Sequence, residues 1–477
     1  MTSENSFRKA EARPSFPNLE KGVVDRWKRD KTFQRSLDQS KDKNEFILYD
    51  GPPFATGNPH YGTIFISALK DVVCRYKSMR GFFVPRAWGW DCPGLPIETI
   101  AEKNLGLKDK GEIEGSVGVK AFNAECRRIV SGYDQNWREY IDRIGRWVDM
   151  EHPYRTLDRS FMESVIWAFA EAHKKGLIYK DYRVAPYCYR CETSLSLSEI
   201  RVDDATRPKQ DRAITVKFAL RELAGVSALA WTTTPWTLPS NLALAVGPEI
   251  EYVVANTQMG KVLLARQALK RYERELGKDP EVVESYSGQQ LLEMKLSYEP
   301  LFPYFKDKRG FVVISADFVS TGDGTGIVHM APAFGEDDYW ACRGHNIEVQ
   351  NPVDASGKFT PVVSDFAGQN VHDANPAIIK LLKSRDVVVR DETIEHNYPH
   401  CWRCRTPLIY RALDAWYFKI EAIRQRLLEA NEDINWYPDT VKHGRFGNWL
   451  ENARDWNISR NRFWATPIPV WECKGCG

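Results

Sequence analysis

A loop rich in glycine and proline, residues 51–63, holds the side chains best suited to chemistry, His60 and Thr63. An apolar run, residues 46–50, comes before the loop and a helical pattern follows it, which predicts the order strand, loop and helix. In this order the free backbone N–H groups and the positive end of the helix dipole point at whatever lies above the loop. Because glycines let an anion come close to the chain, the loop is typical of a phosphate-binding site.

The elements around this loop follow from the spacing of apolar residues. The helix is indicated by positions three and four apart, Phe65, Leu69, Val72, Val73 and Tyr76, and Gly81 marks its end. A plain strand-to-helix turn with Thr63 as an ordinary helix N-cap is the alternative interpretation. The next strand-like stretch, residues 82–98, carries Asp91 beyond the C-terminal end of a strand, where ligands bind in α/β folds. A carboxylate at that place can hold an ammonium group.

Residues 51–62 read Gly-Pro-Pro-Phe-Ala-Thr-Gly-Asn-Pro-His-Tyr-Gly, which resembles the first signature of class I aminoacyl-tRNA synthetases in its isoleucyl form. The resemblance implies that Asp91 holds the α-ammonium group of the amino acid and that Pro52 lines the amino-acid pocket. The residues that it implies for ATP, which comes with Mg²⁺, are Gly57, His60, Gly62 and Thr63, with His60 and Thr63 as the catalytic pair. In such a step the amino-acid carboxylate attacks the α-phosphorus, and the protein contributes positioning and donors aimed at the developing charge.

Three positions depart from the pattern of this family. Thr63 stands where the family has a second histidine, Pro93 replaces the histidine usual before Gly-Leu-Pro, and Ala465 replaces the glycine usual after tryptophan. All three fall near the implied synthetic site. Loss of one donor to developing charge lowers turnover on the order of a hundredfold. We therefore expect the departures to weaken activation without changing the fold.

Six of the ten cysteines form three Cys-x-x-Cys pairs, which begin at Cys188, Cys401 and Cys473. In a chain without a secretory signal such pairs indicate metal sites before disulfides. Two thiolates cannot complete a tetrahedral zinc shell, so the pairs Cys188/Cys191 and Cys401/Cys404 are predicted to form one four-cysteine Zn²⁺ site. A thioredoxin-like redox pair is the alternative. The family resemblance agrees with zinc at the base of an inserted domain.

The third pair, Cys473 and Cys476, is half of a second metal site. The chain offers no further ligand pair for it, so either the missing pair lies in sequence outside this chain or the half-site binds no metal. The chain also has no Lys-Met-Ser-Lys-Ser-like motif, the second class I signature. Both features favour a fragment of a longer protein.

Between the first two cysteine pairs, short β-branched runs alternate with turns, which predicts a compact and mostly β domain. Residues 231–241 place three threonines before two prolines and an asparagine, and residues 324–338 contain a histidine and two aspartates. Taken alone, these segments are as typical of a strand surface, a buried histidine and a helix cap. Together they resemble the editing domain of isoleucyl, valyl and leucyl synthetases.

The editing resemblance assigns a role to each matching residue. It implies that Asp338 binds the α-ammonium group of a mischarged amino acid and that Thr233 and His329 shape the pocket. The residues that it implies for the tRNA end and the ester are Thr232, Thr234 and Asn241, and water performs the hydrolysis. Such a second pocket has a physical reason, because one methylene group contributes only about 1–3 kcal/mol to selection.

Length and composition bound the architecture. The chain has 477 residues, of which 43% are apolar and 27% charged, with a net charge of +2, so we expect a globular protein of two to four domains. Neither a bilayer-spanning run nor a signal peptide is present in this sequence, which predicts a cytoplasmic protein without a membrane partner. A tRNA partner needs a local basic face, for which the candidates are Lys174, Lys175, Lys180, Arg183, Arg445, Arg454, Arg460 and Arg462. Each of these could equally be a solvated surface charge.

The predicted fold class is α/β, a Rossmann-type catalytic domain interrupted by a mostly β editing domain. Residues 1–190 form its first part, residues 191–400 the insertion with its zinc-pinned neck, and residues 401–477 the return. The resemblance implies ATP-dependent activation of isoleucine, transfer to its tRNA and hydrolysis of mischarged valyl-tRNA, by a protein expected to be a monomer. Two alternatives stay open: a paralogue that binds tRNA or amino acid without activating it, and an editing hydrolase alone.

Overall fold

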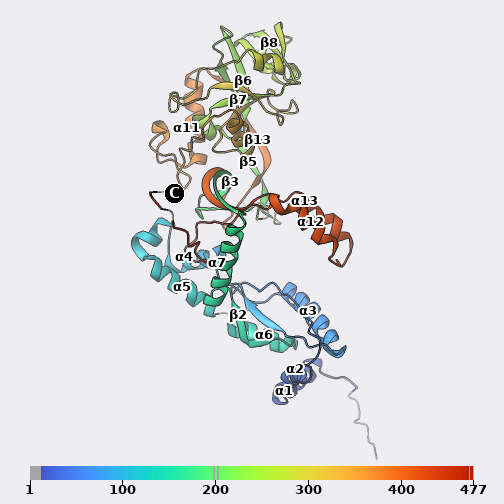
Figure 1. Ribbon diagram of the computed structural model, residues 1–477. Helices are drawn as coiled ribbons and strands as arrows, with labels where there is room; N and C mark the ends of the chain where they lie inside the picture. Colours follow the sequence, from blue (N-terminus) through green and yellow to red (C-terminus); the bar gives the residue numbers. More distant parts are fainter. Residues whose placement is uncertain (1–11, 133, 197–198, 201–203, 472, 476–477) are drawn as a thin grey trace, which may run out of the picture. The chain divides into compact units, whose positions relative to one another are not determined.

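The structure is a computed structural model that describes residues 12–132, 134–196, 199–200, 204–471 and 473–475. The chain divides into two compact units (Figure 1). Unit 1 comprises residues 1–171 and 462–477, and unit 2 comprises residues 172–461. The three-segment division predicted from the sequence stays a prediction. Among the described residues, no helix combines the length and the apolar character that crossing a membrane requires.

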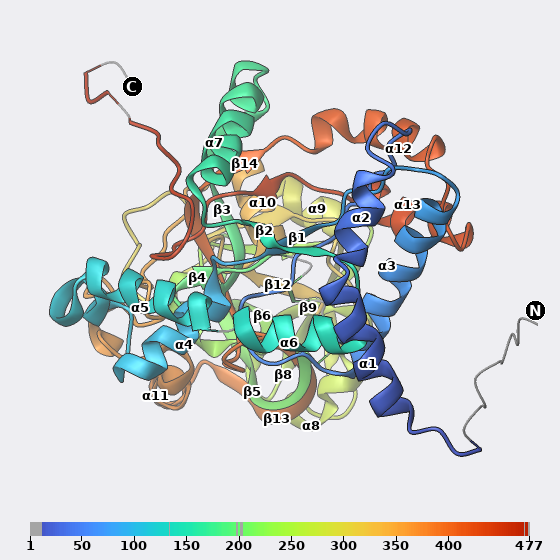
Figure 2. The same cartoon turned by 90° about the horizontal axis from the view of Figure 1, so that it is seen from below.

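Unit 1 combines helices with a small parallel sheet. Its helices are α1 (Phe16–Arg29), α2 (Thr32–Asp38), α3 (Tyr61–Met79), α4 (Leu95–Leu105), η1 (Ile113–Val117), α5 (Val119–Gly132), α6 (Asp134–Ile144) and α7 (Arg159–Lys174), the last of which runs on into unit 2. Its strands, β1 (Ala87–Trp90) and β2 (Asp149–Arg155), pair in parallel. Figure 2 shows α4 beside α5, and the two helices pack together. Parallel strands alternating with helices match the predicted α/β class.

The strand predicted over residues 46–50 is wrong as a regular element. The segment instead makes isolated parallel bridges at its two ends, between Glu45 and Phe83 and between Phe54 and Asp91. The side chain of Tyr49 between them is 92% exposed. Because Pro52 and Pro53 have no N–H group, a continuous hydrogen-bonded ladder cannot run into the loop. The segment still runs parallel to the chain that contains β1. The loop therefore lies at the C-terminal end of β1, next to Asp91, as predicted.

The predicted helix after the loop is confirmed as α3, but its apolar face is not part of the core. Phe65 is 67% exposed and Val72 is 65% exposed, whereas Ser67 and Cys74 are buried. Polar contacts hold the inward face: Lys70 and Arg146 both pair with Asp50, the latter at 3.1 Å. The spacing of apolar residues therefore identified the helix but not the side that packs within unit 1.

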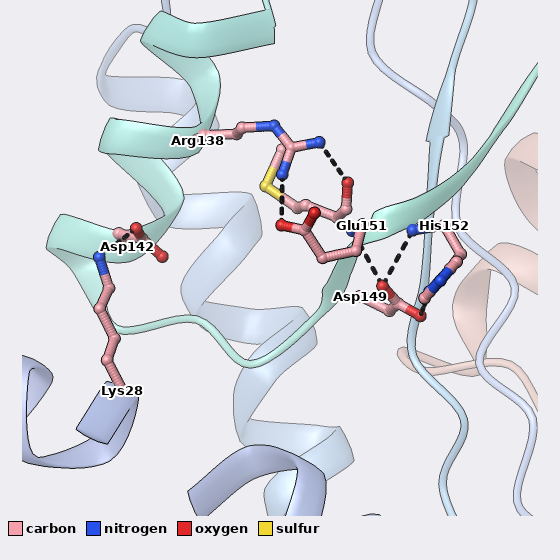
Figure 3. A network of polar contacts seen from close by, with 7 residues as sticks. Lys28, Arg138, Asp142, Asp149, Glu151 and His152 are labelled. Atoms are coloured by element: carbon pink, nitrogen blue, oxygen red, sulfur yellow. Dashed lines mark hydrogen bonds and ion pairs between the residues drawn. The ribbon is translucent and has the colours of Figure 1, made fainter. Parts of the chain in front are cut away.

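Polar contacts also fix α6 against β2 (Figure 3). Nη1 of Arg138 donates to Glu151 at 2.7 Å, and its Nη2 donates to the carbonyl oxygen of Met150 at 2.6 Å. Asp149 accepts the backbone N–H groups of Glu151 and His152 at 2.9 and 3.1 Å. These bonds close the turn at the start of β2 and so hold its register beside β1.

The core of unit 1 is aromatic. Trp88 and Trp90 of β1 pack edge-on at 5.3 Å between ring centroids, and Trp90 meets Trp137 of α6 at 5.7 Å. Gly89 between them has to be a glycine, because a Cβ atom there would lie 2.2 Å from the ring of Tyr154 on β2. This packing sets the position of the end of β1, where Asp91 follows.

Unit 2 contains two sheets among its described residues. The smaller sheet has the antiparallel order β15-β14-β3-β4. Its strands are β3 (Ile178–Cys188), β4 (Thr193–Ser194), β14 (Ile409–Phe418) and β15 (Trp456–Asn457). Residues far apart in the sequence meet here, since Tyr187 pairs with Ile409 and Ile178 with Phe418. We call this sheet the neck sheet.

The larger sheet of unit 2 confirms the mostly β insertion. Its nine described strands are β5 (Thr206–Ala219), β6 (Val226–Thr232), β7 (Ala243–Val246), β8 (Glu251–Thr257), β9 (Gly260–Ala265), β10 (Glu281–Ser287), β11 (Val312–Ser315), β12 (Ile327–Met330) and β13 (Val388–Pro399). They follow the order β10-β8-β9-β6-β12-β7-β11, and β5 joins β13 to β6. The long β5–β13 ribbon is visible below β6 and β7 in Figure 1.

Helices lie around both sheets of unit 2. They are η2 (Pro235–Ser240), η3 (Arg266–Ala268), η4 (Lys270–Tyr272), α8 (Glu273–Leu276), α9 (Gly288–Glu293), α10 (Glu336–Gly344), η5 (Ser364–Phe366), α11 (Val371–Ser384), η6 (Glu421–Ile423), α12 (Arg424–Glu432), η7 (Lys442–Phe446) and α13 (Gly447–Glu451). Figure 1 shows α12 and α13 side by side, where they pack together. Buried residues of β5, β6, β7, β8, β9, β12 and α11 form one continuous apolar core.

Candidate functional site

In unit 1 the signature loop is bonded directly to the segment that carries Asp91. The backbone N–H of Asp91 donates to the carbonyl oxygen of Pro53 at 2.9 Å, and the N–H of Ala55 donates to the carbonyl oxygen of Asp91 at 3.0 Å. Pro52 and Asp91, far apart in the sequence, are thus brought to one place. Burial raises the pKa of Asp91 to about 6, although a hydrogen bond from Thr156 opposes the rise. A carboxylate in this setting favours a cationic ligand.

The loop leads into α3 through a reciprocal cap. The helix begins at Tyr61 with His60 as its N-cap, so the interpretation of Thr63 as the N-cap is wrong. Thr63 lies three residues further on, where its Oγ1 accepts the backbone N–H of His60 at 3.3 Å. Both side chains therefore belong to the first turn of a 19-residue helix, the end that attracts anions.

Two glycines of the loop serve this arrangement. Gly57 adopts a φ of +73°, which side chains disfavour, and its carbonyl oxygen accepts a bond from Trp137 at 3.2 Å. A Cβ atom on Gly62 would lie 3.1 Å from the ring of His60. The glycines thus allow the turn and leave room for the exposed imidazole.

A buried carboxylate, which the sequence analysis did not identify, ties the returning segment to this region. Oε1 of Glu98 accepts the backbone N–H groups of Phe463 and Trp464 at 2.7 and 2.8 Å, and its Oε2 lies 3.3 Å from Nζ of Lys110. The side chain of Glu98 is fully buried and that of Lys110 is 4% exposed. The indole N–H of Trp464 donates to the carbonyl oxygen of Cys92 at 2.8 Å. A charged residue inside the apolar first turn of α4 was the available signal.

Two of the departures from the family pattern lie together. The backbone N–H of Gly94 donates to the carbonyl oxygen of Trp464 at 3.0 Å. Pro93 precedes Gly94 and Ala465 follows Trp464, so both altered residues flank this one hydrogen bond. Thr63 belongs instead to the first turn of α3.

The structure brings together the first two cysteine pairs. The four sulfur atoms of Cys188, Cys191, Cys401 and Cys404 lie within 4.8 Å of one another, and those of Cys188 and Cys404 are 3.4 Å apart. This group can hold a metal ion, as predicted. Cys188 ends β3 and Cys401 follows β13, so the group joins the two chain segments that flank the insertion.

The two cysteine turns have matching backbones. The residue after each pair, Glu192 and Arg405, has a positive φ, of +45° and +64°. Hydrogen bonds from Cys188 and Cys191 lower the pKa of Cys401 to about 7. The same donors lower the pKa of Cys404, and the pKa of Cys188 is raised because its thiol donates to the neighbouring sulfurs. The pKa of Cys191 is raised as well, so Cys401 and Cys404 are the two thiols that ionise most readily, and thiolates bind metal. Of the tentative half-site, Cys473 is exposed and Cys476 lies outside the described residues.

In unit 2 the two segments singled out for editing meet at one edge of the large sheet. β6 ends at Thr232 and β12 ends at Met330, and the two strands pair in parallel through Trp231 and Val328. Their C-terminal ends therefore lie together. Thr237 Oγ1 is 2.8 Å from Nε2 of His329, which joins the hydroxyl-rich stretch to β12.

The hydroxyl groups of the stretch contact one another. Oγ1 of Thr234 lies 3.3 Å from that of Thr232 and 3.2 Å from that of Thr237. The backbone N–H of Thr234 donates to Thr232 Oγ1 at 3.1 Å, while Thr233 is partly exposed. Asn241, after η2, is buried and reaches Nδ1 of His329 at 3.1 Å. The structure thus gathers the threonines, Asn241 and His329.

Asp338 lies in the first turn of α10, beyond the end of β12. Its Oδ2 accepts the backbone N–H of Ala331 at 2.7 Å, which places it next to the strand of His329. Burial raises the pKa of Asp338 to about 7. Phe334 from the connecting loop packs on Trp236 of the hydroxyl-rich stretch at 4.8 Å between ring centroids. The carboxylate of Asp338 and the hydroxyl-rich stretch therefore both lie beside the C-terminal end of β12.

Several of the candidate basic residues are already paired in unit 2. Arg183 bonds Asp181 at 2.7 Å, Arg454 bonds Glu336 at 2.5 Å, and Arg460 bonds Glu199 at 2.8 Å. Their charges are partly neutralised where they lie. The predicted basic face for tRNA stays a prediction.

Comparison with known proteins assigns the family. Residues 22–477 match the family model described as tRNA synthetases class I (I, L, M and V), so the chain belongs to this family, which confirms the resemblance and the α/β class. The chain is 50% identical over 475 residues to an isoleucine–tRNA ligase of Corynebacterium efficiens, covering 96% of this chain and 45% of that protein. It is 48% identical over 487 residues to an isoleucine–tRNA ligase of Mycobacterium tuberculosis, covering 98% and 46%.

The chain thus spans 45–46% of the length of these two curated relatives. Among solved structures, it is similar to a LeuRS in a ternary complex with tRNA and LeuAMS from Agrobacterium radiobacter. That match has a TM-score of 0.33 and 16% identity, and covers 82% of this chain and 52% of the other.

Proposed function

We propose that this chain carries two functions of an isoleucine–tRNA ligase: activation of isoleucine with ATP, in unit 1, and hydrolysis of mischarged valyl-tRNA, in unit 2. The observation that carries the proposal is the backbone pairing of the signature loop with Asp91. This pairing places the loop that leads into the N-terminus of α3 next to the carboxylate of Asp91, at the C-terminal end of β1. The helix end can bind an anion, and the carboxylate can bind an ammonium group. A bound amino acid needs both, because its ammonium is held while its carboxylate meets a phosphate.

In the activation step the isoleucine carboxylate attacks the α-phosphorus of ATP, an adenylate forms and pyrophosphate leaves. Asp91 holds the α-ammonium group and Pro52 lines the pocket. His60 and Thr63, at the N-terminus of α3, donate to the phosphates together with the loop around Gly57 and Gly62. Mg²⁺ accompanies ATP. Transfer then moves the isoleucyl group to a hydroxyl of the terminal ribose of its tRNA, and AMP leaves.

In the editing step water adds to the ester carbonyl of valyl-tRNA, and the ribose hydroxyl leaves. Asp338 holds the α-ammonium of the valyl group. Thr232, Thr233 and Thr234 line the pocket at the end of β6, with His329 behind them. This second selection is needed because valine differs from isoleucine by one methylene group, which is worth about 1–3 kcal/mol.

Isoleucine-dependent ATP–pyrophosphate exchange by the full-length protein tests the activation half of this proposal. We expect exchange that depends on isoleucine and falls in Asp91→Ala. Thr63→His should raise its rate, because an imidazole adds a donor at the phosphates. Binding of isoleucine without any exchange would instead support the alternative of a paralogue that binds the amino acid without activating it. The neighbouring departures at Pro93 and Ala465 favour that alternative.

We also propose that the four-cysteine group binds one Zn²⁺. Zinc bonded to four sulfurs at about 2.3 Å sets them about 3.8 Å apart, which fits sulfurs all within 4.8 Å. Replacing Cys401 with alanine is expected to remove the zinc and to increase hydrogen exchange in β3 and β14 of the neck sheet. Metal analysis and exchange of the purified variant check this. Faster exchange with the zinc content retained would contradict it.

Fidelity is expected to decrease as the pH falls from about 8 to about 6. Burial raises the pKa of Asp338 to about 7 and that of Asp91 to about 6. Each carboxylate binds an ammonium group only when ionised, so each function weakens as the pH falls through the pKa of its own group. Editing should therefore decline before activation. Profiles of kcat/KM against pH for both reactions check this, and a shared midpoint would contradict it.

A further inference from the structure

The buried amide of Asn241 is bonded within the protein on every side that the structure describes. Its Oδ1 accepts the hydroxyl of Tyr298 at 2.7 Å. Its Nδ2 reaches the carbonyl oxygen of Ala243 at 2.9 Å, that of Met330 at 3.4 Å and Nδ1 of His329 at 3.1 Å. Tyr298 itself is fully buried and packs on Phe218 and Phe311.

The carbonyl groups determine which way each hydrogen bond runs. Carbonyl oxygens only accept, so the side of Asn241 that faces Ala243 has to be the NH₂ group. The amide oxygen then faces Tyr298, whose hydroxyl has to donate. Of the two remaining neighbours of the NH₂ group, Nδ1 of His329 at 3.1 Å is closer than the carbonyl oxygen of Met330 at 3.4 Å, so the second hydrogen points to Nδ1. Nδ1 is therefore an acceptor without a hydrogen. By elimination the ring hydrogen of neutral His329 is on Nε2.

The hydrogen bonds continue from His329 into the hydroxyl-rich stretch. The Nε2–H group of His329 donates to Oγ1 of Thr237 at 2.8 Å. The hydroxyl of Thr237 in turn donates to the carbonyl oxygen of Thr234 at 2.8 Å. A chain of donors thus runs from Tyr298 in the core to the backbone of Thr234, beside the end of β6.

We propose that Tyr298 and Asn241 are positioning residues of the editing pocket, which hold His329 as the neutral tautomer with its hydrogen on Nε2 and so fix the threonine turn. This inference rests on the proposed editing function. It changes the role expected for Asn241, which acts through His329 rather than on the tRNA end. It also makes His329 a support for Thr237, since both ring nitrogens are engaged.

Charge and burial agree with this assignment. Burial lowers the pKa of His329 to about 4, so the ring is neutral at physiological pH. A neutral ring has one donor and one acceptor, which are the two roles that its neighbours Thr237 and Asn241 require. A protonated ring would instead direct an N–H at the NH₂ group of Asn241.

Tyr298→Phe in the full-length protein tests the chain of donors. It removes one hydroxyl, keeps the ring between Phe218 and Phe311, and leaves the amide oxygen of Asn241 without its donor. We expect the kcat for valyl-tRNA hydrolysis to fall about tenfold, with KM unchanged, because a buried acceptor is left unsatisfied and the amide can turn over. Tyr272→Phe is the matched control, since that buried hydroxyl bonds only Thr215 among the described contacts, at 2.8 Å, and it should change kcat less than about twofold.

Exchange of the ring C2 hydrogen of His329, followed by mass spectrometry across a pH series, reads the state of the ring directly. We expect a pKa for His329 well below its ordinary value in the wild type and Tyr272→Phe, and a higher one in Tyr298→Phe. Asn241→Asp is the second variant: its carboxylate only accepts, so the hydrogen moves to Nδ1, the pKa of His329 rises further, and kcat falls more than in Tyr298→Phe.

The outcomes separate this inference from the proposed function. If the wild type does not hydrolyse valyl-tRNA, the editing proposal fails, and the C2 exchange still decides the state of His329. If Tyr298→Phe and Asn241→Asp leave both the exchange and kcat at the level of Tyr272→Phe, the positioning role is refuted. A rise in KM alone in Asn241→Asp would instead make Asn241 a direct contact of the substrate.

Discussion

Replacing Asp338 with alanine is expected to slow the hydrolysis of valyl-tRNA by about a hundredfold or more, while isoleucine charging keeps its wild-type rate. The Asp338 carboxylate is held in place by the N–H of Ala331 at 2.7 Å, and burial raises its pKa to about 7. A buried carboxylate is stabilised strongly when it pairs with a cation, here the α-ammonium group of the valyl ester. Removing one partner of a buried, hydrogen-bonded charge pair costs about 2–5 kcal/mol, and a hundredfold loss, about 2.8 kcal/mol, lies in the lower part of that range.

The neighbouring residue supplies the control for this prediction. Asp337 is exposed and lies in the same turn of α10, so Asp337→Ala removes the same charge from the same helix end without touching the pocket. Deacylation of preformed valyl-tRNA by the two full-length variants measures the difference. Equal rates in both variants would show that Asp338 acts only as a charge at a helix N-terminus.

Replacing Glu98 with alanine is expected to release the returning segment from the core of unit 1. The buried carboxylate holds the N–H groups of Phe463 and Trp464 and lies beside Nζ of Lys110. Removing one partner of a buried ion pair destabilises by about 3–5 kcal/mol, and here the change also leaves two backbone N–H groups without their acceptor. Hydrogen exchange over residues 462–465 should accelerate by at least a hundredfold, and the KM for isoleucine should rise, since Trp464 bonds the carbonyl oxygen of Cys92 next to Asp91.

An exposed ion pair of the same unit is the comparison for Glu98. Glu163 bonds Arg159 at 2.8 Å on α7, and both side chains are mostly exposed. Such surface pairs contribute about 0–1 kcal/mol, so Glu163→Ala should leave the exchange over residues 462–465 unchanged. If Glu98→Ala behaves like Glu163→Ala, the buried carboxylate does not hold the segment.

The sequence predicted best the features that short stretches of chain determine. The loop of residues 51–63, the helix α3 and the mostly β insertion each depend on local spacing, and each is present. Chemistry also predicted a long-range feature. Two cysteines cannot complete a tetrahedral site, and the two pairs do meet although Cys188 and Cys404 are 216 residues apart.

Features that depend on tertiary partners could not be predicted in the same way. The apolar positions of α3 identify a helix, but the side that packs within unit 1 is the polar one, held by Asp50. The run of residues 46–50 has strand character, yet prolines beyond it limit the pairing to isolated bridges. Glu98 accepts the N–H groups of Phe463 and Trp464 from 365 and 366 residues away, and a charged residue in an apolar turn does not show which distant residues it will contact.

The candidate editing site illustrates both cases. The order of the threonines, His329 and Asp338 pointed to one pocket, and the structure sets them around the ends of β6 and β12. The contribution of Tyr298 was not visible, because a single tyrosine between Ser297 and Glu299 carries no local pattern, and in the structure it forms an isolated bridge with Leu220 outside the regular strands. Its role emerges only from the direction of the hydrogen bonds around Asn241.

We propose that one polypeptide carries an activating site in unit 1 and a hydrolytic site in unit 2. The most direct measurement is ATP consumption by the full-length protein with valine, with and without isoleucine-specific tRNA. We expect tRNA to increase the ATP consumed while little valyl-tRNA accumulates, and we expect valyl-tRNA to accumulate in Asp338→Ala. A wild-type protein that charges isoleucine but accumulates as much valyl-tRNA as the variant would contradict the claim.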